Sequence, residues 1–289
     1  MGILRRWFGR GGKAGKQGPA AGKLGSQQHM DMRVSPSLSA RVSVGGPDMD
    51  VTKMTKSDQW KQMGLLMTTV GRYEDAMSCF EKGLQIAPGD IELVANKGAT
   101  LGILGRYEEA LVCHDRALGI DPKKSGLWKN KGYALYALGR HEEALSCYER
   151  GLELAPGDSA LWGNRGAALA ALGQHAEAVR CFERGLEINP RDAVLWRNKG
   201  LSLAEMKREE EELACYERGL EAAPEDPALL KNKGVVLHSR GRYQEALSCF
   251  DRALKSDPRD ASLWVNKGVT LIALGRAEEA QLCLRRGGR

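Results

Sequence analysis

Apolar residues recur at helical spacing along most of the chain, in two stripes separated by a short polar break. In residues 125–158 the first stripe consists of Leu127, Trp128, Leu135 and Leu138, and the second of Ala144, Leu145, Tyr148 and Leu152. This spacing predicts two amphipathic helices, which we call helix A and helix B.

The residues between the stripes predict where each helix begins and ends. Gly139 follows the first stripe and is expected to end helix A in a left-handed conformation. Glu142 and Glu143 fall in the first turn of helix B, where the helix dipole favours negative charge. Pro156 follows helix B, and Asp158 is predicted to cap the next helix A.

The same pattern returns every 34 residues without insertion or deletion. All seven cysteines fall in this phase, at Cys79, Cys113, Cys147, Cys181, Cys215, Cys249 and Cys283. A fixed period of this size is the signature of a stacked repeat architecture. The predicted units are 57–90, 91–124, 125–158, 159–192, 193–226, 227–260 and 261–289.

Within each unit, certain positions keep the same kind of residue. In residues 125–158 these are Trp128, Gly132, Gly139, His141, Ala144, Tyr148, Gly151 and Pro156. The period and these residues resemble the tetratricopeptide repeat (TPR) family over residues 57–289. The resemblance implies an all-α, right-handed αα-solenoid of TPR helix pairs, with six full repeats and one partial repeat, whose A helices line a concave groove.

Two units depart from this pattern. In the fifth, Lys207 replaces the turn glycine and Glu212 replaces the small residue of helix B. A carboxylate in a close helix crossing costs free energy, so we expect looser packing or a local shift there. The seventh has no separate capping helix, and we expect Leu271, Leu274 and Leu282 to leave an apolar end face.

The charge is unevenly distributed. The chain of 289 residues has a net charge of +6, but residues 57–289 hold 33 Lys and Arg against 34 Asp and Glu. The basic character therefore belongs to residues 1–56, which hold ten Lys and Arg and three Asp. A neutral array argues against nucleic acid as a partner, because phosphate binding needs a basic stripe.

Residues 1–56 are predicted to be a flexible, basic, glycine-rich N-terminal arm. Its first ten residues, MGILRRWFGR, would place Ile3, Leu4, Trp7 and Phe8 on one side of a helix. This segment is either a solvated tail or a weak contact with an anionic membrane surface or a partner groove. No apolar run is long enough for a membrane span or a secretory signal.

Equivalent cysteines of neighbouring units are two helices apart, too far for a disulfide bond. We interpret them as small buried thiols in a reducing compartment, and we expect a cytoplasmic location.

One repeated position of helix A carries amides: Asn96, Asn130, Asn164, Asn198, Asn232 and Asn266. Family resemblance places this position in the groove. Each amide can donate and accept a hydrogen bond, so the row could pair with the backbone of an extended peptide. The alternative is a structural asparagine that is satisfied within the array.

Two further sets of groove residues are candidates for peptide binding. The position before the asparagine carries four cations that could accept acidic ligand groups: Lys61, Lys129, Arg197 and Lys231. Tyr133 and Tyr136, one helical turn apart, are the best aromatic contacts. The position after the asparagine is mostly lysine or arginine, and the sequence gives no firm account of that stripe.

No catalytic constellation, phosphate loop or metal motif is present in the sequence, so we expect neither an enzyme nor a cofactor. The leading interpretation is a protein-interaction scaffold that holds an extended peptide or a partner segment in its groove. The alternative is a nucleic-acid-associated helical-repeat protein that uses the basic arm.

Overall fold

The computed structural model describes residues 55–288 of the chain. The predicted flexible arm and the patch of residues 1–10 therefore lie outside the described residues, except for Thr55 and Lys56.

The described residues form fourteen α-helices that alternate between helix A and helix B. The A helices are α1 (Lys56–Thr69), α3 (Ile91–Ile103), α5 (Ser125–Ala137), α7 (Ser159–Ala171), α9 (Ala193–Glu205), α11 (Pro227–Ser239) and α13 (Ala261–Ala273). The B helices are α2 (Tyr73–Ile86), α4 (Tyr107–Ile120), α6 (His141–Leu154), α8 (His175–Ile188), α10 (Glu209–Ala222), α12 (Tyr243–Ser256) and α14 (Ala277–Gly287).

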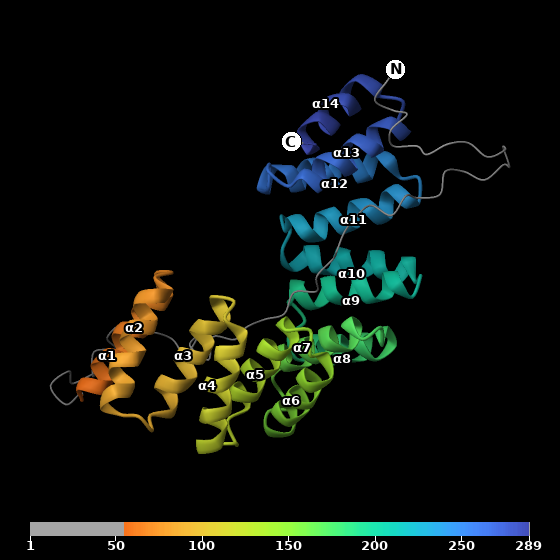
Figure 1. Ribbon diagram of the computed structural model, residues 1–289. Coiled ribbons are helices and arrows are strands. Elements are labelled where there is room, and N and C mark those ends of the chain that lie inside the picture. Colours follow the sequence, from red (N-terminus) through yellow and green to blue (C-terminus); the bar gives the residue numbers. More distant parts are fainter. Residues whose placement is uncertain (1–54, 289) are drawn as a thin grey trace.

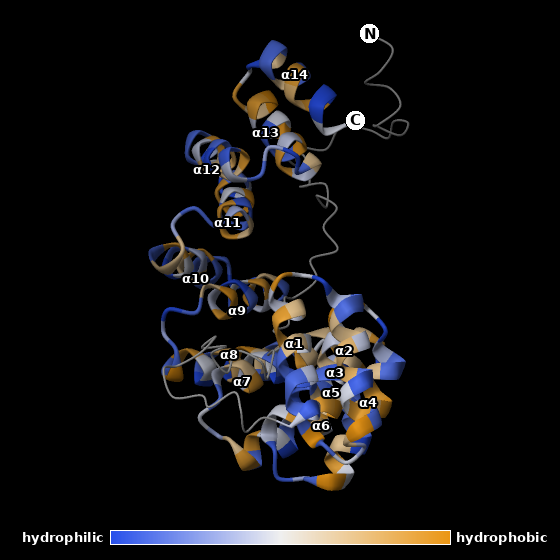
Figure 2. Ribbon diagram, turned by 90° about the vertical axis from the view of Figure 1, so that its left-hand side faces the viewer, coloured by the Kyte–Doolittle hydropathy of each residue, from blue (hydrophilic) through white to orange (hydrophobic). Residues whose placement is uncertain are grey.

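The helices pack as consecutive pairs, and the pairs stack along a curved row from α1–α2 to α13–α14 (Figure 1). Individual helices carry both hydrophobic and hydrophilic segments, as the two stripes require (Figure 2). The predicted all-α solenoid of helix pairs is confirmed. The predicted helix ends are also confirmed: Gly139 has φ +76°, and Asp158 accepts hydrogen bonds from the backbone N–H groups of Ala160 and Leu161.

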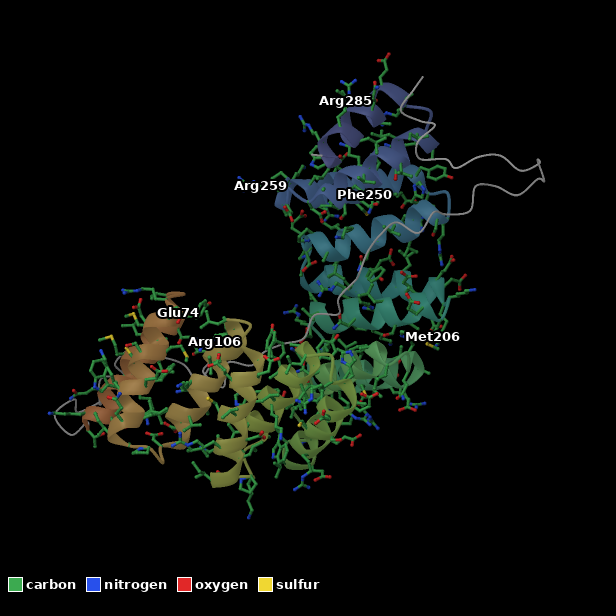
Figure 3. All side chains as sticks on the ribbon, in the orientation of Figure 1. Glu74, Arg106, Met206, Phe250, Arg259 and Arg285 are labelled. Atoms are coloured by element: carbon green, nitrogen blue, oxygen red, sulfur yellow. The ribbon has the colours of Figure 1, made fainter. Side chains whose placement is uncertain are left out.

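Helix A and helix B of each pair cross where a glycine meets a large side chain. A Cβ added to Gly132 would lie 2.5 Å from the Tyr148 ring, and one added to Gly64 would lie 2.4 Å from the Phe80 ring. Both rings are fully buried. Phe250, which occupies the same place in the sixth pair, lies inside the stack (Figure 3). The glycine is therefore required because any side chain would force the two helices apart.

Successive pairs meet through a second close contact. Gly151 of α6 lies against Leu161 of α7, where an added Cβ would be 2.9 Å from a Leu161 methyl carbon. The Trp162 indole N–H donates to the Pro156 carbonyl at 2.9 Å. The bond satisfies the polar end of a large, partly buried ring and holds the loop between the pairs.

Ion pairs also cross every junction between pairs. Each joins a cation of helix A, in the position after the asparagine, to an acid of the preceding helix B. The six pairs are Lys97–Glu81, Lys131–Asp115, Arg165–Glu149, Lys199–Glu183, Lys233–Glu217 and Lys267–Asp251. We call this set the junction ladder. It explains the stripe of cations, although each partly exposed pair contributes at most about 1 kcal/mol.

The two ends of the array break the junction ladder in different ways. At the N-terminal end, Met63 replaces the cation and is exposed. At the C-terminal end, α14 carries Gln281 and Arg285 where the other B helices carry an apolar residue and an acid. Arg285 lies on α14 at this end of the stack (Figure 3).

The prediction of an apolar C-terminal face is wrong for two of its three leucines. Leu271 is 1% exposed, because it packs into a cluster with Leu247, Ala280 and Cys283. Leu274 packs against the same cluster. Leu282 is exposed, as expected, so a single leucine and not a face is left open.

The fifth unit keeps the turn and the close helix crossing of the other units, so the looser packing or local shift expected there is wrong. Lys207 has φ +59°, the left-handed conformation that glycine adopts in the other units. Glu212 is 8% exposed and accepts a hydrogen bond from the Tyr216 hydroxyl at 3.1 Å. Burial raises the pKa of Glu212 to about 7, against the opposing hydrogen bond from Tyr216. In the third unit, where the crossing residue is alanine, the buried Tyr148 hydroxyl has no partner.

We predict that Lys207→Gly stabilises the protein, because a lysine in the left-handed region costs about 1 kcal/mol that glycine does not. Urea denaturation followed by circular dichroism would measure the change in the free energy of unfolding. The matched control is Gly173→Lys, at an equivalent turn with φ +76°, which should destabilise by a similar amount. Equal stability of Lys207→Gly and the wild type would contradict the prediction.

We also predict that Glu212 makes stability depend on pH. Its folded pKa of about 7 exceeds the ordinary value of 4.5, so the folded state binds more protons between these pH values. The contribution of Glu212 to the free energy of unfolding therefore falls as pH rises through that window.

Glu212→Gln keeps an acceptor for Tyr216 and removes the titration. The variant should have the same free energy of unfolding as the wild type near pH 4.5. At pH 8 it should be more stable than the wild type by roughly 0.5–2 kcal/mol. Glu210→Gln, at an exposed position of the same helix, serves as the control. A stability difference between Glu212→Gln and the wild type that does not change with pH would rule out this effect.

Candidate functional site

The six asparagines of the amide row lie on six successive A helices and are 1–8% exposed. The structure therefore places them beneath the surface of the array. Their part in peptide binding stays a prediction.

The asparagines differ in their partners. Asn164 and Asn198 each have an interaction partner. Asn130, on α5, is buried with neither its amide nitrogen nor its amide oxygen hydrogen-bonded. A buried amide without partners costs about 1–3 kcal/mol. Asn130 therefore does not fit the alternative of an asparagine satisfied within the array.

Three of the candidate cations bind the cap of the next helix A. Lys129 Nζ lies 2.7 Å from Asp158 Oδ2, while Oδ1 of the same carboxylate accepts the backbone N–H groups of the cap. Lys61 and Lys231 make the corresponding contacts with Asp90 at 3.2 Å and Asp260 at 3.1 Å. One carboxylate thus joins two neighbouring A helices.

The pKa shifts agree with these contacts. Burial alone would lower the pKa of Lys61, but hydrogen bonds to Glu92 and Asp90 outweigh it and raise the pKa. Burial alone would raise the pKa of Asp260, but hydrogen bonds from Ser262 and Lys231 outweigh it and lower the pKa. Lys61 therefore stays charged, and all three lysines already have carboxylate partners. Arg197, the fourth candidate, also has a partner.

The two candidate tyrosines lie partly buried on α5, with Lys129 and Tyr133 four residues apart and Tyr136 three residues further. This spacing puts all three on one face of the helix. The Tyr133 ring packs edge-on against the Tyr107 ring, with 6.2 Å between the ring centroids. Burial raises the pKa of Tyr133 to about 12, and Tyr107 adds to this shift. Tyr133 is therefore a neutral hydroxyl at physiological pH.

Two ring contacts at the turn between helix A and helix B were not predicted from the sequence. The ring centroids of Tyr136 and His141 are 4.9 Å apart, and those of His238 and Tyr243 are 5.1 Å apart. The same two positions thus hold Tyr then His in the third unit, and His then Tyr in the sixth. Tyrosine and histidine thus change places between two positions that are five residues apart. This swap is the sequence signal from which the contact could have been predicted.

The described residues contain no cluster of three or more metal-binding side chains, and no helix among them is long and apolar enough to cross a membrane. Six of the seven cysteines are buried, which confirms the expectation of buried thiols for these six. Burial raises the pKa of Cys147 to about 11, so its thiolate is scarce at neutral pH.

Family comparison assigns the fold to a known class. Matches described as "Tetratricopeptide repeat" cover residues 62–90, 91–124, 126–158, 159–192, 193–226, 213–248 and 232–286. Together they span most of the chain. The chain belongs to the tetratricopeptide repeat family, and this repeat fold is generally a non-enzymatic scaffold.

Solved structures agree with this assignment. A tetratricopeptide repeat protein from Parabacteroides merdae is 19% identical with a TM-score of 0.63, over 80% of this chain and 92% of that one. PilF of Pseudomonas aeruginosa is 20% identical with a TM-score of 0.62, over 72% and 94%. PilW, described as a type IV pilus biogenesis factor, is 20% identical with a TM-score of 0.62, over 67% and 90%. At these identities the likeness shows the fold alone. No curated protein matches the sequence.

Two neighbouring residues of α5 give a test of these local environments. Lys129→Met should destabilise the array by about 1–3 kcal/mol, because the partly buried Asp158 loses a charged partner. Asn130→Ala should cause no such loss, because the amide it removes has no hydrogen bond to lose. Thermal and urea denaturation would measure both. A larger loss for Asn130→Ala than for Lys129→Met would show that the amide is a structural contact.

Proposed function

We propose that the array is a protein-interaction scaffold that holds an extended peptide in its concave groove, with α5 as the main contact. The observation that carries this proposal is the Asn130 amide, which is buried without a hydrogen bond on either atom. The backbone of an extended peptide offers both the donor and the acceptor that this amide needs.

The neighbouring side chains of α5 supply the other contacts. Tyr133 and Tyr136 are partly exposed, rigid and neutral, and such rings are typical anchors of protein interfaces. Both Asn130 amide atoms are closed to solvent, so a peptide reaches them only when neighbouring side chains move aside. We therefore expect the tyrosines to make the first contact and the amide to bond afterwards.

The charges of the groove favour a neutral or mixed peptide over a strongly acidic one. The cations that could attract an acidic ligand already bind Asp90, Asp158 and Asp260. An acidic ligand would have to displace these cap carboxylates.

The contacts of the junction ladder also weigh against the nucleic-acid interpretation. Each of its six cations is paired with an acid of the preceding helix, so the stripe is not a row of unpaired charges. Phosphate binding depends on such a row.

We predict that peptides selected from a random phage-displayed library on the full-length protein bind through α5. Isothermal titration calorimetry would give the dissociation constant of one selected peptide. Tyr133→Ala and Tyr136→Ala should each weaken binding about tenfold, equivalent to about 1.4 kcal/mol. Asn130→Ala should weaken it by a smaller factor, of about two to ten, because a single hydrogen bond contributes about 0.5–1.5 kcal/mol.

The control is Glu142→Ala, an exposed position on helix α6, which should leave the dissociation constant unchanged. Circular dichroism of each variant separates a loss of binding from a loss of folding. If the three α5 variants fold normally and bind like the control, the selected peptides do not use this groove.

A further inference from the structure

The N-terminal end of the array exposes an apolar face. It is formed by Met63 and Leu66 of α1 and by Val70, which caps the C-terminus of α1, and these side chains are 46%, 40% and 59% exposed. Their spacing of three and four residues puts them on one side of the helix. We call this surface the α1 end face.

The equivalent surface of every later A helix is covered. In the other six units the residue corresponding to Leu66 is buried. These residues are Thr100, Ala134, Ala168, Ser202, Val236 and Thr270. The position corresponding to Met63 holds the cation of the junction ladder, which pairs with an acid on the preceding helix B. The α1 end face is thus the surface that receives a preceding helix B elsewhere in the array.

The composition of the α1 end face indicates a covering element. Repeat arrays normally end in a polar surface, and α14 follows that rule with Gln281 and Arg285. The N-terminal end has an apolar surface in its place, because Met63 stands where the other A helices carry a cation. Methionine at this position makes the face more apolar and leaves no ladder cation facing the space beyond α1.

We propose that residues 1–10 of the same chain dock on the α1 end face. This segment, MGILRRWFGR, carries Ile3, Leu4, Trp7 and Phe8 at a spacing that puts them on one side of a helix. The proposal departs from the expected flexible arm only for these ten residues.

The charges of the two surfaces are compatible. A ladder cation at the position of Met63 would repel a segment that contains Arg5, Arg6 and Arg10, whereas methionine does not. Glu74 is exposed in the first turn of α2, shortly after Val70, and offers the arginines an acidic neighbour. The cation between them, Arg72, already pairs with Asp75. The arm is the basic part of the chain, and the α1 end face is where the array has lost its cation.

The intervening chain is long enough. A flexible linker of the length of residues 11–54 has a root-mean-square span of about 35 Å. The far end of α1 lies only about 20 Å from Thr55, at 1.5 Å per residue. Ten residues form a marginal helix alone, but tethering raises their effective concentration to the millimolar range.

Hydrogen exchange on the full-length chain would test the proposal. The variant Trp7→Glu with Phe8→Glu removes the docking side chains and lies outside the array, so it does not disturb the array's core. It should speed amide exchange in residues 63–70 at least threefold and remove protection from residues 1–10. The matched control, Leu24→Glu with Leu38→Glu, changes two apolar residues elsewhere in the arm and should leave residues 63–70 unchanged.

The reciprocal variant is Leu66→Lys, which should expose residues 1–10 to the same degree as the Trp7 and Phe8 variant. Circular dichroism shows whether Leu66→Lys folds, and the arm variant decides the question if it does not. Exchange in residues 63–70 that is the same in the arm variant and the wild type would overturn the proposal. So would protection of residues 1–10 that appears only in a dimer, or only with phosphatidylserine vesicles, since either would identify another occupant.

Discussion

The close crossing of helix A and helix B within each pair is the constraint on which the rest of the array depends. In six pairs a glycine backbone lies directly against a ring, such as Gly132 against Tyr148 or Gly64 against Phe80. This contact fixes the separation of the two helices and therefore the surface that each pair presents to the next. The junction contacts, such as Gly151 with Leu161, can repeat from unit to unit only because that separation is constant.

Charge in the array is used mainly to join neighbouring units. Lys129 binds the cap carboxylate of the next helix A, and Lys131 binds Asp115 of the preceding helix B. Two cations of α5 therefore join its helix pair to the pair before it and to the pair after it. Because these charges are already matched, the peptide binding that we propose relies on a few neutral groups, and α5 carries three of them, Asn130, Tyr133 and Tyr136.

The period, the pairing of helices and the turns could be predicted because they rest on local rules of spacing and backbone conformation. Gly139 is a clear case, since the pattern predicted a left-handed turn there and its φ is +76°. The partners of Lys129 and the burial of Asn130 could not be predicted, because they depend on how one unit sits against the next. The same reason explains the wrong expectation for Leu271, which is covered by α12 and α14. For Glu212, the sequence predicted the cost of burial but not the Tyr216 hydroxyl that offsets part of it.

The junction ladder has a consequence for how such a chain can change in length. Its pairs all run in one direction, from a cation on the later unit to an acid on the earlier one. Excising one internal block of 34 residues, or duplicating it, would bring another acid to the same cation and leave no charge without its counterpart. Growth by tandem duplication is therefore electrostatically neutral inside the array. Growth at the C-terminal end is not neutral, because the ladder cation of a unit added after α14 would face Arg285, which is another cation.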